Sequence, residues 1–389
     1  MGKIHGRYAI VGVGMSPRST NSGKTPLRMA LEASRAALAE AGMHPTEVDC
    51  ILSYHENDSC SGHWLATYLG TRASYYNDIY GGGGSTEVLI AEAIGLIEAG
   101  IAKTCLLFRS MNGRSGKRMG GGQTSRGNKV YGSPGAGFLV PYGVSTPGER
   151  YGFLAVRHMH ETGLTQRDMG TVAVTLNENA QRNPAARFYG RPLTLERYLE
   201  EPYISFPFRK FDYCVETDEA NAIIVTSAER ARNCKTRPVY IKAITAHNAT
   251  RHAHQYALPD ILEVGGCFAA PRIFQDAEVS PSDIQVAAIY DCFTWVVLYQ
   301  LEVYGFVKRG EAGAFAASGQ LKIGGKLPIN TAGGMLTEGY THGMNNVIEL
   351  VRQVRHDYEG ASRQVPGCEL GMSTGWGGPT SAGAMIVHN

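Results

Sequence analysis

The sequence carries almost no excess charge of either sign. Its 389 residues include 37 Lys and Arg against 35 Asp and Glu, a formal net charge of +2, and both signs are spread along the chain. A nucleic-acid-binding protein concentrates positive charge on the surface that meets the phosphates. The even balance therefore argues against a dedicated nucleic-acid-binding role.

Cysteines at CxxC spacing are also absent. The eight cysteines contain no CxxC pair, which zinc ribbons and thiol–disulfide enzymes require. Two His-x-His pairs, at 158/160 and 252/254, have no third Asp, Glu or Cys ligand at a suggestive spacing, so no metal site is predicted. Free thiols are typical of a reducing compartment, and we expect a cytoplasmic protein.

Long apolar runs are missing as well. The most apolar long window, Val286–Phe306, contains Asp291, Gln300 and Glu302, which a bilayer-spanning helix would not tolerate easily. The N-terminal segment MGKIHGRYAIVGVG lacks the long apolar stretch of a signal peptide. We therefore expect no membrane span.

Three common catalytic signatures fail. Gly23-Lys24-Thr25 would need its leading glycine at Arg18, so it does not form a phosphate-binding loop. The dinucleotide fingerprint that begins at Gly12 would place its third glycine at Pro17. No GxSxG elbow occurs, so an α/β-hydrolase would have no nucleophile.

The pattern of apolar residues predicts alternating strands and helices. Short β-branched runs predict buried strands at 8–13, 49–54, 104–110, 286–289, 369–373 and 382–387. Helical spacing predicts helices at 26–43, 85–99, 150–162, 169–182, 293–304 and 341–355. Thr25 and Pro26 supply an N-cap and a first-turn proline for the first helix. Continuous apolar strands that alternate with helices predict an α/β fold with a parallel-type sheet covered by helices.

The middle of the chain, roughly 120–240, has a different character. It contains a Gly/Ser/Arg-rich stretch at 120–137 and an aromatic and proline-rich stretch at 188–211, and we interpret it as an excursion from the sheet. Glycine-rich turns at 80–84 and 333–339 lead into helices at comparable points of the two flanking regions. This suggests a duplicated α/β half.

Three segments place polar residues where such a fold would present them. They are the four-glycine turn YGGGGST (80–86), the strand end IYDCFT (289–294), and the turn NTAGGMLTEGYTHGM (330–344). A glycine turn that opens a helix lets backbone N–H groups and the helix dipole approach a ligand. Together these segments predict an active site.

The sequence resembles the thiolase superfamily, and within it the sterol-carrier-protein-type thiolases and their aldolase relatives. The resemblance covers nearly the whole chain, through AIVGVG (9–14), the GST-plus-helix segment (84–100), FLAVRHMHETGLTQRDMGTVAV (153–174), PFRKFDYCVETDEANAIIV (207–225), YDCFTWVVLYQLEVYGF (290–306) and LPINTAGGMLTEGYTHGMN (327–345). It implies a five-layered αβαβα sandwich of two similar halves, at 1–120 and 238–389, with a loop domain and the end of the first half at 121–237. It also implies a CoA thioester as substrate.

The departures from that family concern its catalytic residues. The position of the nucleophilic cysteine is Gly81, and that of the second cysteine is Gly375 or Thr374. The histidine of the GHP motif falls at Tyr340, and the His or Asn that opens the HDCF or NEAF motif falls at Tyr290. Without a thiolate at these positions no acyl-enzyme can form there, which argues against thiolysis.

Two phenols at these positions resemble the steroid side-chain-cleaving aldolases, which act on β-hydroxyacyl-CoA thioesters. The resemblance implies that Tyr290 and Tyr340 are the paired catalytic tyrosines. A retro-aldol cleavage needs a base for the β-hydroxyl, an acid for the α-carbon and a site for the enolate oxygen, and a phenol can serve if its surroundings favour its anion. The sequence does not separate base from acid, although Tyr340 is favoured as the base. Asp291 and His342 are expected to orient the tyrosines rather than carry protons.

The glycine turns are the expected source of N–H groups for the thioester oxygen. The residues assigned to this role are Gly81, Gly82, Gly334, Gly377 and Gly378. Cys292, two residues after Tyr290, is the rival nucleophile, because entry into a helix could lower its pKa. Cys214 and Cys267 are interpreted as buried packing residues.

The leading hypothesis is therefore a lyase that cleaves a 17-hydroxy steroid side-chain CoA thioester into a 17-ketosteroid and propionyl-CoA. The alternatives are an acyl-CoA thiolase that uses a displaced cysteine, and a non-catalytic acyl-CoA or lipid-binding subunit. We expect no covalently bound cofactor, since CoA is part of the substrate. The resemblance also implies a homodimer and a separate small subunit with a zinc ribbon and an OB-fold.

Overall fold

The computed structural model describes residues 4–116, 139–248, 259–378 and 380–389. Its main sheet has nine strands in the order β3-β2-β4-β7-β1-β8-β11-β10-β9. The strands are β1 (Tyr8–Met15), β2 (Cys50–His55), β3 (Tyr75–Tyr80), β4 (Thr104–Asn112), β7 (Asp218–Ser227), β8 (Val239–Asn248), β9 (Val286–Ala288), β10 (Leu370–Gly377) and β11 (Ser381–His388).

The strand order shows two similar halves. They meet where β1 and β8 pair through only two residue pairs, Ala9 with Tyr240 and Ile10 with Val239. Outward from this junction, each half places its first strand, then its last strand, then its middle strands. The first and last strands of each half, β1 with β7 and β8 with β11, pair antiparallel. The duplication expected from the two glycine-rich turns is thus present in the strand order.

The predicted parallel sheet is only partly correct. β2 pairs in parallel with β3 and β4, and β9 with β10, but the remaining neighbours are antiparallel. The physical reason is that the central strands are covered on both faces. A strand buried on both faces has a continuous apolar sequence in either direction, so its composition does not reveal its orientation.

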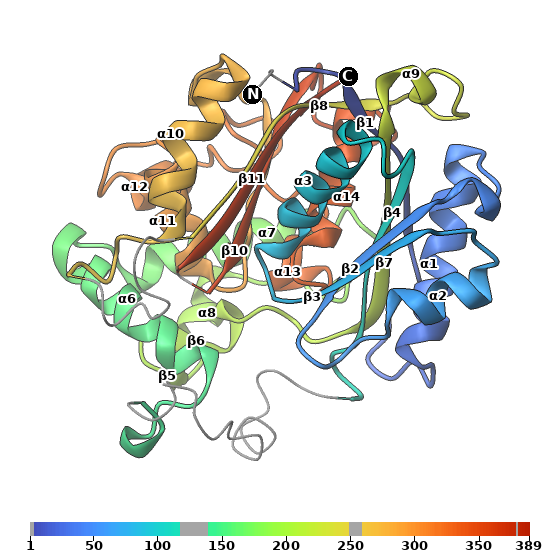
Figure 1. Ribbon diagram of the computed structural model, residues 1–389. Helices are drawn as coiled ribbons and strands as arrows, with labels where there is room; N and C mark the ends of the chain where they lie inside the picture. The colour runs from blue at the N-terminus through green and yellow to red at the C-terminus, as the bar shows by residue number, and fades with distance from the viewer. Residues whose placement is uncertain (1–3, 117–138, 249–258, 379) are drawn as a thin grey trace.

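Helices divide the molecule into five layers (Figure 1). α1 (Pro26–Ala41) and α2 (Gly62–Leu69) cover the outer face of the first half, and α10 (Gly265–Ala277) and α11 (Thr294–Val303) that of the second. α3 (Ser85–Glu98) and α14 (Met344–Arg355) lie between the two halves and contact strands of both. This is the αβαβα sandwich that the sequence predicts.

The caps of α1 follow the sequence closely. The Thr25 hydroxyl accepts from the N–H of Arg28, and Pro26 occupies the first helical position. The helix ends at Ala41, two residues earlier than predicted, because Gly42 adopts a left-handed conformation with φ of 71°.

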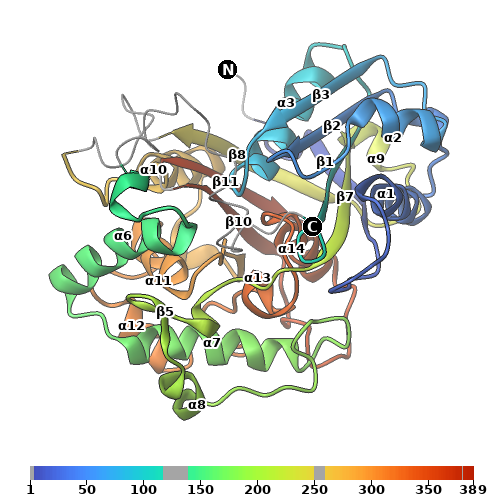
Figure 2. The ribbon, with the colours of Figure 1, turned by 90° about the horizontal axis from the view of Figure 1, so that it is seen from below.

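The intervening region packs beneath the second half (Figure 2). It contains α6 (Pro147–Thr162), α7 (Gln166–Ala180), α8 (Leu195–Glu200), β5 (Tyr203–Ser205) and β6 (Phe208–Arg209). Leu154 and Val172 of this region share one apolar core with Trp295 of α11. The predicted boundary at 120/121 lies outside the described residues, as does the whole 120–137 stretch.

Short elements complete the part of the chain that the structure describes. They are α9 (Ala228–Ala231), α12 (Ala312–Ala317), α13 (Gly334–Thr337) and 3-10 turns at Pro45–Glu47, Val140–Tyr142, Lys210–Asp212 and Pro281–Asp283. Within the described part of the chain, no helix combines the length and apolarity that crossing a bilayer requires.

Candidate active site

Tyr290 and Tyr340 come together in the interior. Tyr290 lies two residues after β9, and Tyr340 lies in the turn before α14, yet their Oη atoms are 3.3 Å apart, within hydrogen-bonding distance. Only 2% of Tyr290 and 8% of Tyr340 is exposed. The two phenols that the sequence singled out therefore form one buried, hydrogen-bonded pair.

The backbone of each tyrosine is fixed by polar side chains. The N–H of Tyr290 donates to Thr374 Oγ1 at 3.0 Å, and its carbonyl accepts from Gln300 Nε2 at 2.7 Å. Thr374 in turn donates to Gln300 Oε1 at 2.7 Å. The N–H of Tyr340 donates to Thr217 Oγ1 at 2.9 Å. These bonds restrict where the two rings can lie.

Two glycines make room for the Tyr290 ring. A Cβ on Gly83 would overlap the Cζ and Oη atoms of Tyr290, and one on Gly343 would lie 3.0 Å from its Cδ2. Gly83 belongs to the turn before α3, and Gly343 is the N-cap of α14. The ring is therefore held between the two central helices at their N-terminal ends.

Burial raises the pKa of both phenols well above 10. The neighbouring Tyr340 raises the pKa of Tyr290 further, whereas the hydrogen bond from Tyr290 lowers that of Tyr340. Both groups are thus neutral at pH 7, and Tyr340 is the one whose anion its partner stabilises. The sequence analysis made catalysis by a phenol conditional on surroundings that favour its anion, and here desolvation disfavours the anion of both phenols.

Asp291 binds the N-terminus of α13. Its carboxylate accepts from the N–H groups of Met335 at 3.0 Å and Leu336 at 3.1 Å, and from Asn346 Nδ2 at 2.9 Å. Burial nevertheless raises its pKa to about 6. A Cβ on Gly334 would overlap this carboxylate. Because an anion already occupies the turn at Gly334, this turn cannot also bind an enolate oxygen, which corrects the role expected for Gly334.

His342 is held by a buried ion pair. Its Nδ1 accepts from Arg109, whose Nη2 is 3.0 Å and Nε 3.2 Å away. Arg109 is fully buried in β4, and its Nη2 lies 2.7 Å from Asp58 Oδ2. Burial and the charge of Arg109 lower the pKa of His342 to about 3. The imidazole is therefore neutral, and its ring centroid is 4.9 Å from that of Tyr340.

The other glycines expected to bind the thioester oxygen lie near the turn before α3. Gly81 donates its N–H to the His55 carbonyl at 3.0 Å, so this N–H is not available to a ligand, contrary to expectation. Gly82 and Gly83 follow it. The N-cap of α3, Gly84, makes no side-chain cap, and the N–H of the first helical residue, Ser85, donates to the Gly82 carbonyl oxygen at 3.0 Å. Gly377 lies beside this turn, at Gly84, and Gly378 has open space around it.

No thiol is available where the thiolase cysteines would be. At Gly375 a Cβ would overlap Glu87 Oε2 and lie 2.9 Å from the Gly83 carbonyl oxygen, so the site has no space for a cysteine side chain. At Gly81 a Cβ would overlap the hydroxyl of Ser85.

The other cysteines near the site are not activated. Burial raises the pKa of Cys292 well above 9 and also raises that of Cys214 and Cys267. A thiol that stays protonated is a poor nucleophile, which argues against the rival role of Cys292. Cys214 and Cys267 are partly buried and pack against the main core, in agreement with their expected packing role.

Glu87 is a buried acid behind the glycine turn. Its Oε1 accepts from Ser373 Oγ at 3.0 Å, and its Oε2 has no hydrogen-bond partner in the part of the chain that the structure describes. Burial raises its pKa to about 7. Folding therefore favours the protonated acid, and the stability that this form provides is present below the ordinary pKa of 4.5 and lost as the pH rises through 7.

We expect Glu87→Gln to remove this pH dependence. Each pKa unit corresponds to about 1.4 kcal/mol, so wild type should lose about 2 kcal/mol more than the variant between pH 5.5 and 8.5. Urea unfolding of both proteins at the two pH values measures the difference. Equal losses would show that Glu87 is ionised in the folded protein. Contributions from other buried acids are common to both proteins and cancel.

The His158/His160 pair does not form a metal site. His158 Nδ1 accepts from Trp295 Nε1 at 3.1 Å, and its Nε2 is 2.8 Å from Glu302 Oε2. Residues 252 and 254 lie outside the described residues. Across the described ranges, no three His, Cys, Asp or Glu side chains are grouped so that they could hold a metal ion.

Sequence reasoning missed several residues of the site. Gly83 and Glu87 were part of the recognised motif, but nothing in it shows that one contacts Tyr290 and the other fills the space beside Gly375. Arg109 carried a usable signal, because an arginine inside the predicted buried strand 104–110 must find a partner. Asp58, in the loop after β2, gave no usable signal in the sequence.

The site thus combines two neutral phenols in contact, a neutral imidazole and a helix N-terminus without a capping side chain. It can move a proton between two oxygens and stabilise a developing oxyanion, and it holds no thiolate for acyl transfer.

Comparisons with known proteins agree with this chemistry. A family model described as thiolase C-terminal domain-like matches residues 247–389. A Mycobacterium tuberculosis protein named 17-hydroxy-3-oxo-4-pregnene-20-carboxyl-CoA lyase is 40% identical over 361 residues, which cover 90% of this chain and 92% of that protein. A steroid side-chain-cleaving aldolase of Thermomonospora curvata is 37% identical over 98% of both chains.

The fold comparison gives the same result. A solved structure described as Ltp2-ChsH2(DUF35) aldolase superposes with a TM-score of 0.89 at 35% identity, over 100% of this chain and 99% of that chain.

Proposed function

The chain belongs to the thiolase-like family of the steroid side-chain-cleaving aldolases, and we propose that it is a carbon–carbon lyase acting on a β-hydroxyacyl-CoA. The proposed substrate is a 17-hydroxy steroid whose side chain ends in a C20-carboxyl-CoA thioester, and the products are a 17-ketosteroid and propionyl-CoA. The observation that carries the proposal is the buried Tyr290–Tyr340 pair, with glycine where a thiolase has cysteine.

The phenol pair can act as a relay without a free phenolate. As the C17–C20 bond breaks, its electron pair moves to the thioester as an enolate, and the hydroxyl oxygen forms the ketone. The hydroxyl proton passes to Tyr340 Oη, the proton of Tyr340 passes to Tyr290 Oη, and the proton of Tyr290 passes to C20. Both phenols end neutral, as their raised pKa values require.

The relay needs a dry environment and a site for the enolate oxygen. Both phenols are almost fully buried, which keeps bulk water from competing for the proton. The first turn of α3 brings its N–H groups and positive dipole end to the same point. The steps use no covalently bound cofactor, since CoA arrives with the substrate.

The absence of a usable thiol distinguishes this reaction from thiolysis. We expect the protein to convert a β-hydroxyacyl-CoA into a ketone and a shorter acyl-CoA with no added CoA, which mass spectrometry detects directly. Intact-protein mass after reaction with a labelled acyl-CoA should show no acyl group on any cysteine, Cys292 included. A trapped acyl-cysteine, or turnover only with added CoA, would support the thiolase alternative. No turnover with any partner would support a binding subunit.

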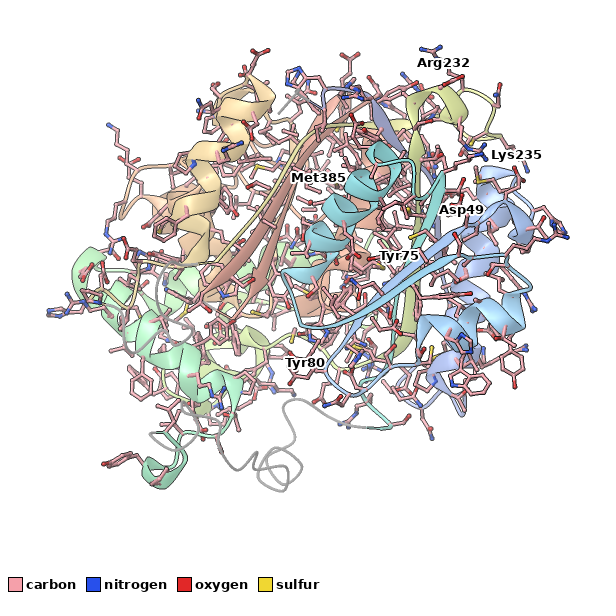
Figure 3. The ribbon with its side chains drawn as sticks, viewed as in Figure 1. Asp49, Tyr75, Tyr80, Arg232, Lys235 and Met385 are labelled. Atoms are coloured by element: carbon pink, nitrogen blue, oxygen red, sulfur yellow. The ribbon has the colours of Figure 1, made fainter. Side chains whose placement is uncertain are left out.

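A homodimer is proposed from the exposed edge of the sheet. β3 is the edge strand of the first half, with Tyr75 and Tyr80 at its two ends (Figure 3). Tyr76 of this strand is exposed, as are two aromatic residues of the neighbouring α2, Trp64 and Tyr68. An uncovered edge with aromatic side chains around it is a surface that a second copy can pair with and bury.

A small zinc-ribbon and OB-fold subunit is the second proposed partner. The solved relative is described as a complex with ChsH2(DUF35). In this chain, Ile204 and Phe206 on the β5–β6 hairpin and Phe153 and Val156 on α6 are exposed, and α6 contacts β5. This apolar surface supports a docking site.

The eight free cysteines of the described residues fit a reducing compartment, and we place the enzyme in the cytoplasm.

We expect the chain to form a dimer alone and a complex of two chains with two partner subunits when its DUF35-type partner is added. Light scattering with size exclusion measures both masses. Activity should rise on addition of the partner, because the exposed apolar surface is then covered. Placing a charge on the docking surface with Ile204→Glu should prevent the larger complex and leave the dimer intact. A fully active monomer that binds no partner would contradict the proposal.

A further inference from the structure

The second nitrogen of His342 is a buried polar atom with no use in the fold. His342 is 2% exposed, and its Nε2 has no hydrogen-bond partner among the residues that the structure describes. Burying a polar group without a partner destabilises the folded state, because the group loses its hydrogen bonds to water. Such a group in an enzyme site is explained if a ligand supplies the partner.

The protonation of this nitrogen follows from the residues around the ring. The Arg109 guanidinium donates to His342 Nδ1 from both Nε and Nη2, and a guanidinium cannot accept. Nδ1 must therefore be unprotonated. A neutral imidazole has one proton, so Nε2 carries it and can only donate. Asp58 fixes Arg109 from the other side through its 2.7 Å ion pair.

The His342 Nε2–H lies next to the phenol pair. The His342 Nε2 atom is 3.6 Å from the position that a Cβ of Gly82 would occupy, so only the absence of that side chain leaves room beside it. Gly83, the next residue, contacts Tyr290, and the His342 ring lies against that of Tyr340. A ligand atom that reaches the phenols therefore passes next to this N–H.

The backbone holds His342 in an unusual conformation to place it there. Its φ is +51°, in the left-handed region that few residues other than glycine adopt. Tyr54 Oη supports this turn, because it lies 3.0 Å from the Thr341 carbonyl oxygen and 3.3 Å from that of His342. Strain of this kind at a buried polar residue is typical of a functional site.

We propose that the Nε2–H of His342 is a catalytic hydrogen-bond donor to the thioester oxygen of the bound acyl-CoA. The hydrogen bond between the two strengthens as the thioester oxygen gains enolate charge during cleavage. This inference rests on the proposed retro-aldol function, and it changes the role expected for His342 from orienting a tyrosine to contacting the substrate.

The neutral state of the ring suits this role. A pKa of about 3 keeps the imidazole uncharged throughout the working pH range, so it donates without ever losing or gaining a proton. The Glu56 carboxylate faces the same space, with Oε1 2.9 Å from this Cβ position of Gly82.

The test removes the donor and measures its bond directly. His342→Leu should lower kcat by roughly 10²–10³-fold with little change in KM, as expected for a donor that acts mainly in the transition state. His342→Gln can still accept from Arg109 and donate an amide N–H, and it should recover at least ~10-fold of this loss. Equal kcat values for wild type and His342→Leu would overturn the proposal.

An infrared measurement separates this proposal from the proposed function. Binding of propionyl-CoA labelled with ¹³C at the thioester carbonyl should shift its stretching band to lower frequency in wild type and in Tyr340→Phe, but not in His342→Leu. A wild-type protein that shows no shift would overturn the donor role even if it cleaves the steroid thioester. A shift that His342→Leu abolishes, in a protein that cleaves no substrate, would support the donor and refute the lyase. Thermal unfolding of each variant checks that the fold is retained. If His342→Leu is unstable, His342→Met takes its place, because a thioether can accept weakly from Arg109 but has no hydrogen to donate.

Discussion

Replacing Tyr290 or Tyr340 by Phe is expected to lower kcat by roughly 10²–10⁴-fold, the usual cost of losing a general acid or base. Each replacement removes one oxygen of the 3.3 Å pair and interrupts the path of the proton from the hydroxyl to C20. The aromatic rings remain, so packing between Gly83 and Gly343 is retained. Steady-state kinetics on the β-hydroxyacyl-CoA, with circular dichroism as the check on folding, measures the effect.

The double variant tests whether the phenols act as one unit. If a single relay carries the proton, Tyr290→Phe combined with Tyr340→Phe should be no slower than the slower single variant, because the path is already broken. Independent roles would instead make the losses multiply. Tyr80→Phe is a matched control, since this tyrosine is exposed before the glycine turn and outside the pair. Near-native rates for both single variants would show that the phenols only pack.

The hydrogen bond between the two phenols favours one order of proton transfer. The hydrogen bond from Tyr290 lowers the pKa of Tyr340, so Tyr340 is the better acceptor for the hydroxyl proton. Tyr290→Phe removes this hydrogen bond, so Tyr340 keeps only the influences that raise its pKa, of which burial is the largest. The assignment of Tyr340 as the base, which the sequence favoured, stays a prediction.

The sequence predicted the two phenols because they stand in long motifs at fixed positions. It could not predict their separation, which depends on how the end of β9 and the turn before α14 meet across the sheet. The role of Gly334 was misjudged for a similar reason. Asp291 is 44 positions from Met335 in sequence, and only the fold brings its carboxylate to the N–H groups that follow Gly334.

The fold was predictable where strands are buried and caps are local. β1, β4 and α1 follow their apolar patterns to within two residues, with Thr25 as the cap. β3 was not predicted, because its sequence YYNDIY lies at the edge of the sheet, is only partly buried and contains two polar residues. α10 was also not predicted as a helix, and it contains Pro271. Edge strands and proline-containing helices depend on neighbours that a local pattern does not describe.

A side chain at Gly83, in the turn before α3, should also strongly reduce both activity and stability. We expect Gly83→Ala to lower kcat by at least ~100-fold, because the added Cβ would overlap Tyr290 Oη and Cζ and the Trp376 carbonyl oxygen. Displacing a catalytic group by about 1 Å can cost on the order of 10²-fold in rate. Overpacking of this kind also costs about 1–3 kcal/mol of unfolding free energy. Kinetics and urea unfolding measure the two losses.

Gly95→Ala is the matched control on the same helix. Gly95 lies inside α3, and an added Cβ there would have no atom within 4 Å, so alanine should leave kcat unchanged and raise the unfolding free energy by up to ~1 kcal/mol. Combining Gly83→Ala with Tyr290→Phe should recover part of the lost stability, since one overlapping atom is removed, but no activity. A Gly83→Ala protein as stable and as active as wild type would show that the turn does not position Tyr290. The distance between the two phenols, and with it the relay, would then be set by other residues.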